Sequence, residues 1–337
     1  MKRAVLRASL ALVVALVLIE LGWRALGRGP TSYASRRVEP AGYGPFLRTP
    51  QGLLVYAPHA SWTFVYDAVD GSTDPLRVSH RINAFGLRDA ERAFAKPPGA
   101  LRVICLGDSF TFGEGVRVED AYPALLERRL GDALAPRAVE VWNAGVQAYG
   151  TAEAIALFES RLLAAAPDVV TLCFFLNDAT DFERTIAEFT AALEPAPLSW
   201  AARISRVVEA WERGRHARSI AERFVATTRA SLHAAGFARC EAGFRRLREL
   251  ADGHGFRALV LVFPALMELD GDYPFEEEHA LVAAALERAG LETLDLLPAF
   301  RGLDARVLRV HPTDHHPNAR AHAIAAELVA ERLLADR

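Results

Sequence analysis

The stretch LRVICLGDSFTFGEGV, from Leu101 to Val116, decides the fold. Its first six residues form an apolar run, which predicts a buried β-strand, and Gly107 predicts a tight turn where the strand ends. The turn leaves Ser109 at the carboxyl end of the strand, where open α/β sheets bind their ligands. The residue two positions after Ser109 is Thr111, so the GxSxG elbow of α/β-hydrolases is absent. The sequence therefore presents a candidate nucleophile on a different kind of turn.

Segments of strand and helix character alternate from this stretch to the C-terminus, which is typical of a parallel sheet with crossover helices. Strands are expected near residues 102–106, 139–143, 168–175, 257–263 and 291–295. Helices are expected at residues 119–133, 151–166, 237–253, 276–289 and 319–335. This order predicts an α/β fold: a flavodoxin-like three-layer sandwich around a five-stranded parallel sheet.

Four sequence blocks, taken in order, resemble those of the SGNH hydrolases, also called the GDSL family. The first block is GDSF, from Gly107 to Phe110. The other three are VWNAGVQAYGT from Val141, VVTLCFFLND from Val169 and DHHPN from Asp314. Together they span most of residues 101–325. The resemblance implies the SGNH hydrolase fold and an esterase activity.

Ester cleavage needs a hydroxyl nucleophile, a base, a group that orients the base, and donors for the oxyanion. Ser109 would be the nucleophile and His316 the base, because the pKa of histidine lies near neutrality. Asp314 would orient His316. The resemblance implies an oxyanion hole made by the backbone N–H groups of Ser109 and Ala148 and by the Asn177 amide.

Three positions depart from the family pattern. Ala148 stands where block two usually has glycine; if this position needs a positive φ, alanine is strained there, and Gly145 is the fallback donor. The family usually places its aspartate three residues before the histidine, whereas Asp314 lies two before His316. Residues two apart in an extended segment face the same side, so the pair still predicts a triad. Phe175 replaces a frequent glycine and is expected to alter pocket shape more than mechanism.

The C-terminal segment is rich in histidine, and histidine and carboxylate are common metal ligands. The candidate ligands are His311, Asp314, His315, His316 and His322. We expect neither a metal nor another cofactor, because no second cluster has zinc-type spacing and the three cysteines stand alone. His315 is expected to face solvent, and His322 to be a packed or capping histidine.

The N-terminus combines basic residues with a long apolar run. Lys2, Arg3 and Arg7 precede ASLALVVALVLI. As a helix, residues 8–26 would rise about 28 Å, close to the roughly 30 Å hydrocarbon core of a bilayer. Residues 1–27 therefore predict a transmembrane anchor with the rest of the chain outside the cytoplasm. Cleavage as a signal peptide, which would secrete the protein, is the alternative.

The remaining chain divides by composition. Residues 28–50 are rich in glycine, proline, arginine and serine and predict a linker, whereas residues 51–100 contain short β-like runs and predict a β-rich extension. The stretch RINAFGLRDAE within that extension resembles one found upstream of GDS in membrane-anchored bacterial members. The hydrolase domain would occupy residues 101–337, with a helical insertion at about 182–235. This insertion would cap the pocket, touch the membrane surface or pack as an ordinary helix pair.

The net charge of −3 gives no reason to expect nucleic acid as a partner. The combined prediction is a serine ester hydrolase of the cell envelope, acting on O-acyl groups of polysaccharide or on lipid esters. Acyl transfer to a sugar hydroxyl uses the same residues and is one alternative. A non-catalytic carbohydrate-binding or assembly protein that keeps the fold is the other. The sequence does not fix the oligomeric state.

Overall fold

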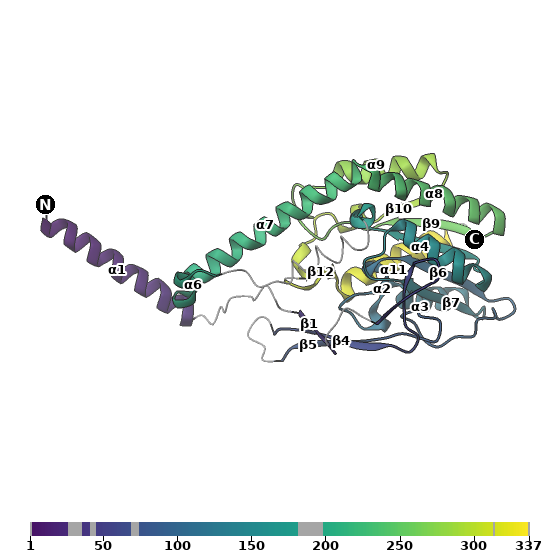
Figure 1. Cartoon of the computed structure of the whole chain (residues 1–337), viewed down its shortest axis with the longest axis horizontal. Helices are drawn as coiled ribbons and strands as arrows, with labels where there is room; N and C mark the ends of the chain where they lie inside the picture. The colour runs from purple at the N-terminus through teal and green to yellow at the C-terminus, as the bar shows by residue number, and fades with distance from the viewer. Residues whose placement is uncertain are drawn as a thin grey trace.

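A five-stranded parallel sheet forms the centre of the protein (Figure 1). The computed structural model describes residues 2–25, 36–40, 45–68, 74–180, 198–312 and 314–335. The strands are β6 (Leu101–Gly107), β7 (Val139–Gly145), β8 (Val169–Phe174), β9 (Arg257–Val262) and β10 (Glu292–Asp295). They lie in the order β10-β9-β8-β6-β7, and every neighbouring pair is parallel. The predicted five-stranded parallel sheet is confirmed.

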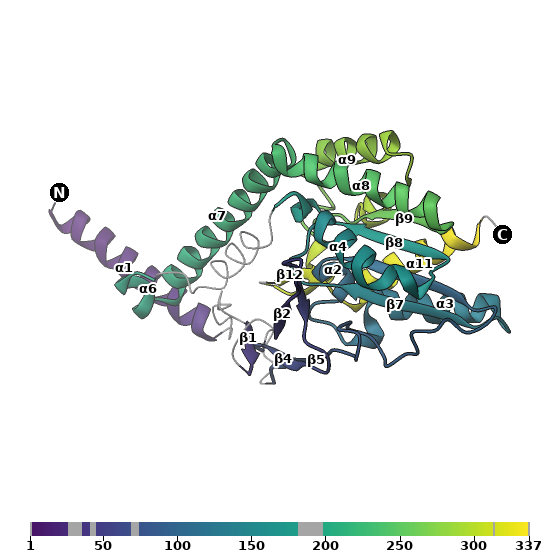
Figure 2. The same cartoon turned by 45° about the vertical axis from the view of Figure 1, so that its right-hand side comes forward.

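Helices cover both faces of this sheet (Figure 2). They are α3 (Tyr122–Leu134), α4 (Thr151–Leu157), α8 (Ala235–His254), α9 (Glu276–Arg288) and α11 (Ala319–Leu334). Right-handed crossovers place α3 on one face and α4, α8 and α9 on the other. The faces differ because the chain moves from β6 to the edge strand β7 and then back across the sheet to β8, β9 and β10. Accordingly, α11 packs on α3 and α4 packs on α8. With helices on both sides, β6 and β8 are buried along their whole length, which explains their continuous apolar sequence.

The strand order also sets the position of the site. The connection from β6 leads to β7, toward one edge of the sheet, and the connection from β8 leads to β9, toward the other edge. The carboxyl ends of β6 and β8 therefore flank the switch point, where the strand order reverses. A short helix, α2 (Ser109–Phe112), follows β6, and a 3-10 turn, η4 (Leu176–Ala179), follows β8. The hairpin of β11 (Arg309–His311) and β12 (Asp314–Pro317) precedes α11. The predicted blocks GDSF, VVTLCFFLND and DHHPN therefore lead into or lie on these three segments.

Smaller elements complete the domain. A π-helical turn (Phe158–Leu162) and a 3-10 turn (Leu163–Ala165) extend α4 to the end of the helix expected at residues 151–166. The remaining short elements are η1 (Val118–Asp120), α10 (Leu297–Phe300) and η5 (Ala305–Val307).

A second, antiparallel sheet precedes the parallel one. It contains β1 (Arg36–Glu39), β4 (Ser61–Tyr66) and β5 (Leu76–Arg81), and the hairpin of β2 (Phe46–Arg48) and β3 (Leu54–Tyr56) lies beside it in sequence. Three of these strands match the expected β-like runs. Strands β1 and β2, however, fall in residues 28–50, where we expected a linker. The reason is that β1 is held by its pairing with β4, a distant partner that local composition does not reveal.

An aromatic cluster joins this sheet to the nucleophile helix. The rings of Trp62 and Tyr56 lie 5.9 and 5.4 Å from the ring of Phe112, and His80 stacks on Phe112 at 5.2 Å. All four side chains are buried. The antiparallel sheet therefore packs directly against α2, the helix that begins with Ser109.

A helical arm extends away from the body of the molecule in both views (Figures 1 and 2). It consists of α1 (Lys2–Ala25), α6 (Trp200–Ile204) and α7 (Arg206–Leu232). The first part of the predicted insertion, residues 182–197, lies outside the described residues. Trp200 and Trp211 are 75% and 57% exposed, so neither aromatic side chain is packed into a core.

The transmembrane anchor predicted for residues 1–27 is not supported. Helix α1 forms there, but among the residues that the structure describes, no helix combines the length and apolar character needed to cross a membrane. Glu20 interrupts the apolar run and contacts protein: its carboxylate accepts hydrogen bonds from the backbone N–H of Arg206 at 2.9 Å and from the Ser205 hydroxyl at 2.9 Å. These bonds attach α1 to the first turn of α7.

Candidate active site

The turn after β6 is shaped by a glycine. Gly107 has a φ of 146°, and a Cβ there would lie 2.4 Å from Thr111 Oγ1 and 2.9 Å from the carbonyl oxygen of Cys173. Asp108 then caps α2 by accepting the backbone N–H of Phe110 at 2.9 Å. Ser109 is consequently fixed as the first residue of α2, at the carboxyl end of β6.

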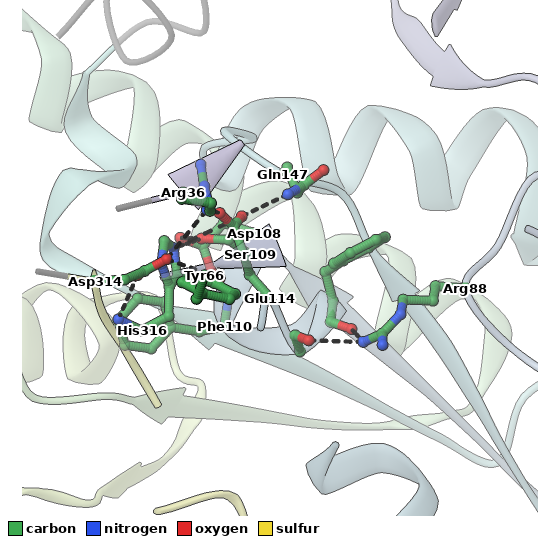
Figure 3. A network of polar contacts seen from close by, with 12 residues as sticks. Arg36, Tyr66, Arg88, Asp108, Ser109, Phe110, Glu114, Gln147, Asp314 and His316 are labelled. Atoms are coloured by element: carbon green, nitrogen blue, oxygen red, sulfur yellow. Dashed lines mark hydrogen bonds and ion pairs between the residues drawn. The ribbon is translucent and has the colours of Figure 1, made fainter. Parts of the chain in front are cut away.

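The structure brings Ser109, His316 and Asp314 into one hydrogen-bonded chain (Figure 3). The Nε2 atom of His316 lies 2.9 Å from Ser109 Oγ, and its Nδ1 lies 2.5 Å from Asp314 Oδ1. The hydroxyl comes from the end of β6, and the other two side chains come from β12. The two-residue spacing works because Asp314 and His316 stand on one extended strand and face the same side.

Asp314 is itself held by two residues of the antiparallel sheet. Its Oδ2 accepts the hydroxyl of Tyr66 at 2.9 Å and Nη1 of Arg36 at 3.1 Å. Burial alone would raise the pKa of Asp314, but the charges of His316 and Arg36 outweigh it and hold that pKa well below its usual range. Asp314 is therefore a buried anion that can orient the imidazole.

Glu114 is a second carboxylate beside His316. It forms an ion pair with Arg36, accepts Gln147 Nε2 at 2.5 Å and lies 3.8 Å from His316 Nε2 (Figure 3). Burial alone would lower the pKa of His316, but the charges of Glu114 and Asp314 raise it to about 9. Sequence reasoning missed Glu114 although it lies inside the quoted GDSFTFGEGV stretch, and it missed Arg36, which has no motif around it.

The candidate oxyanion donors lie at three strand ends. Ala148 has a φ of 63°, so alanine does occupy a left-handed conformation where the family usually has glycine. In the described part of the chain, the backbone N–H groups of Ser109 and Ala148 donate to no protein acceptor. Asn177 lies in the turn after β8 and is half-buried, and its Oδ1 has no hydrogen-bond partner among the described residues.

Gly145 does not suit the fallback role that we gave it. Its N–H already donates to Asn143 Oδ1 at 3.1 Å. A Cβ on Gly145 would lie 2.2 Å from the backbone nitrogen of Phe112, so the loop presses directly against α2. Gly145 therefore serves this close approach, and Ala148 remains the block-two candidate.

Aromatic rings border the histidine. Phe175 stacks on Phe110 with ring centroids 4.0 Å apart, and Phe110 lies 5.6 Å from the His316 ring. Phe263 packs edge-on against Phe110 at 5.0 Å. Phe175, where the family often has glycine, thus extends an apolar wall beside the triad.

The histidine-rich segment does not gather into a single ligand cluster within the described residues. His315 is exposed as expected, His322 packs on Tyr122, and His311 lies 3.2 Å from the carbonyl oxygen of Asp67. Glu114, Asp314 and His316 do place one ligand atom each within 4.8 Å of one another. The guanidinium of Arg36 pairs with both carboxylates, so a cation bound there would have to displace it.

A cavity of about 380 Å³ lies beside the turn after β8. It is lined by Ala179, Thr180, Ala230, Ser231, Ala234, Gly236 and Arg239. The lining comes from η4 and from the junction of α7 and α8. The second half of the predicted insertion therefore borders the turn that carries Asn177.

A serine, a histidine and an aspartate linked at the switch point of a parallel sheet are typical of α/β serine hydrolases. The sequence profile of the GDSL-like lipase/acylhydrolase family matches residues 105–324, more than half of the 337 residues. The chain belongs to this family, and the protein is an enzyme that hydrolyses ester bonds.

Several solved structures resemble this chain. The acetylxylan esterase Axe2 from Geobacillus stearothermophilus is 16% identical, with a TM-score of 0.45 over 70% of this chain and 95% of its own. The acetyl xylan esterase AlAXEase is 16% identical, with a TM-score of 0.45 over 69% of this chain and 100% of its own. A two-domain esterase active on acetylated mannans is 15% identical, with a TM-score of 0.44 over 69% of this chain and 49% of its own. A search of curated proteins found no significant match.

Proposed function

We propose that the protein is a serine esterase in which Ser109 is the nucleophile, His316 the general base and Asp314 the residue that orients the base. The observation that carries this proposal is the continuous chain of contacts from Ser109 Oγ through both nitrogens of His316 to Asp314. A hydroxyl 2.9 Å from an imidazole nitrogen is within proton-transfer distance, and a carboxylate on the other nitrogen fixes the tautomer.

The reaction follows from this geometry. Ser109 Oγ bonds to the acyl carbon while its proton moves to Nε2 of His316. The negative charge develops on the former carbonyl oxygen, where the N–H groups of Ser109 and Ala148 and the Asn177 amide would receive it. His316 then returns the proton to the departing alcohol, and the same steps with water release the acid and restore Ser109.

The substrate class and location extend this proposal. We propose export through the basic and apolar N-terminal segment, with an envelope glycan bearing O-acyl groups as the substrate and a lipid ester as the competing class. The exposed apolar side chains of α1, including Leu16 and Leu18, support an interaction with lipid or with export machinery. Fractionation of cells expressing the full chain and a variant lacking residues 1–27 tests the location: the full chain should be found outside the cytoplasm, and the truncated chain inside it.

Active-site labelling tests the catalytic proposal. A fluorophosphonate probe should label the wild-type protein and not Ser109→Ala, whereas Ser160→Ala, which removes an exposed helical hydroxyl, should label normally. Hydrolysis of p-nitrophenyl acetate should also be lost with Ser109→Ala. Absence of labelling together with retained glycan binding would favour the non-catalytic module. Formation of an acylated sugar when an acceptor glycan is added would favour the transferase.

A further inference from the structure

The loop after α2 places a second carboxylate against the base. The side chain of Glu114 is 1% exposed, and its Oε2 lies 3.8 Å from Nε2 of His316. This is the ring nitrogen that faces Ser109 Oγ, whereas Asp314 contacts the other nitrogen. The imidazole therefore has a buried carboxylate near each of its two nitrogens.

One guanidinium connects these carboxylates (Figure 3). Nη1 of Arg36 forms ion pairs with both Glu114 and Asp314, and the Arg36 side chain is 2% exposed. Arg36 stands on β1 of the antiparallel sheet, outside the part of the chain that carries the triad. Its position means that the antiparallel sheet supplies the cation at the centre of the site.

Glu114 is held from a second direction. Its Oε2 accepts Gln147 Nε2 at 2.5 Å, and the Oε1 atom of Gln147 accepts the hydroxyl of Tyr56 at 2.8 Å. Tyr56 ends β3, so this contact also originates in the segment before the hydrolase domain. The carboxylate of Glu114 is thus fixed by Arg36 on one oxygen and by Gln147 on the other.

The charges of this arrangement suit the reaction. Two carboxylates and one guanidinium carry a net charge of −1 around a neutral His316. When the Ser109 proton reaches His316, the imidazolium and these three groups together carry no net charge. A buried charge without compensation is costly, so this arrangement favours the protonated histidine that forms as Ser109 attacks.

We propose that Glu114 and Arg36 are positioning residues that hold His316 toward Ser109 and set the charge that stabilises its protonated form. The inference rests on the proposed esterase function. It makes the antiparallel sheet a part of the active site, because removal of Arg36 would leave two buried carboxylates facing each other across one imidazole.

Other titratable groups on the elements around the triad stay unchanged in the test. They are Asp108 at the start of α2, Tyr66 on β4, His311 on β11, His315 on β12 and His322 on α11. Tyr66 is hydrogen-bonded to Asp314, and Asp108 Oδ2 lies 3.5 Å from Ser109 Oγ. Differences among the variants therefore report on Glu114 and Arg36.

The pH dependence of kcat/KM for p-nitrophenyl acetate tests the proposal. Activity needs neutral His316, so the rate rises with pH through the pKa of that residue. Glu114→Gln removes a negative charge and should move this rise to lower pH by about one unit, with a roughly tenfold lower kcat. Arg36→Gln removes a positive charge and should move the rise to higher pH. The double variant Arg36→Gln with Glu114→Gln restores the net charge of −1 and should return the rise toward its wild-type position.

A matched control is Glu292→Gln, which breaks an ion pair with Arg257 between β9 and β10 and should leave the profile unchanged. Coincident profiles for the wild type, the two single variants and the double variant would overturn the inference. Shifts of both single variants in one direction would also overturn it, because a general loss of structure has no reason to follow the sign of the charge.

A second readout does not depend on turnover. In the Ser109→Ala background, NMR titration of the His316 ring should give the same order of pKa values: lowest with Glu114→Gln and highest with Arg36→Gln. Equal pKa values in all backgrounds would refute the inference even if a variant had lost activity by misfolding. Loss of fluorophosphonate labelling in the wild type would instead refute the proposed function, so the two failures can be told apart.

Discussion

The two sheets of this protein contribute differently to the site. The parallel sheet ends in Ser109 and Asn177, groups that would touch the reacting atoms. The antiparallel sheet contributes Tyr66, which donates a hydrogen bond to Asp314, and Arg36, which pairs with both Asp314 and Glu114. The groups proposed for bond cleavage therefore come from the parallel sheet and from the β11–β12 hairpin, while the groups proposed to orient and neutralise them come from the antiparallel sheet.

The largest expected effect lies on the parallel sheet. Asn177→Ala should lower kcat by about 100 to 1,000-fold, because it removes one donor to the oxyanion, while KM changes little. Single-turnover and steady-state kinetics with a p-nitrophenyl ester measure both constants. A fall in kcat of less than about fivefold would remove Asn177 from the oxyanion hole, and a rise in KM alone would assign it to substrate binding.

An intermediate effect is expected on the antiparallel sheet. Tyr66→Phe deletes one of the donors to Asp314 but leaves Arg36 in place, so kcat/KM should fall by roughly tenfold. Tyr273→Phe is the control, because it removes a buried hydroxyl that accepts the backbone N–H of Ala265 and contacts Nε2 of the His279 ring. If Tyr66→Phe lowered kcat/KM as much as Asn177→Ala, the antiparallel sheet would do more than orient the catalytic groups, and the proposed difference between the two sheets would not hold.

The smallest effect is expected at Ala148. Glycine at position 148 removes the steric strain of a positive φ, which stabilises the folded state. It also adds conformational freedom to the unfolded chain, which lowers the free energy of unfolding, so the two effects oppose each other. Ala148→Gly should therefore change kcat/KM by no more than about twofold and the free energy of unfolding by less than about 1 kcal/mol. Ala148→Val, with a branched side chain at positive φ, should destabilise the protein by about 1–3 kcal/mol. Thermal melts and kinetics check both variants, and equal stability of the two would show that backbone strain is unimportant here.

Much of the hydrolase domain was predictable from local signals. Apolar runs such as Leu101–Leu106 mark strands buried on both faces, and turn residues mark where each run ends. The blocks around Ser109 and Asn177 were named from the family resemblance, and their convergence was predictable because the carboxyl ends of parallel strands meet at one edge. The spacing of Asp314 and His316 also agreed with one extended strand.

Other features had no local signal. The pairing of β1 with β4 converts a segment of linker-like composition into a strand, and only this pairing carries Arg36 to the triad. The N–H of Gly145, our fallback donor, donates to Asn143 Oδ1, a contact that spacing alone does not specify. The apolar run around Glu20 predicted a transmembrane anchor, whereas in the structure the Glu20 carboxylate accepts hydrogen bonds from the first turn of α7.

The sequence by itself determined the order of strands and helices and the turn that presents Ser109, because these depend on periodicity and on residues close together in the chain. The candidate chemical groups came from the resemblance to the SGNH hydrolases. Only the tertiary structure decided which charges surround His316. Arg36, Glu114 and Asp314 are separated by up to 278 positions in sequence, and their contacts exist because two sheets pack against the same short helix. Electrostatic interactions depend on distance in space, so no local pattern could specify them.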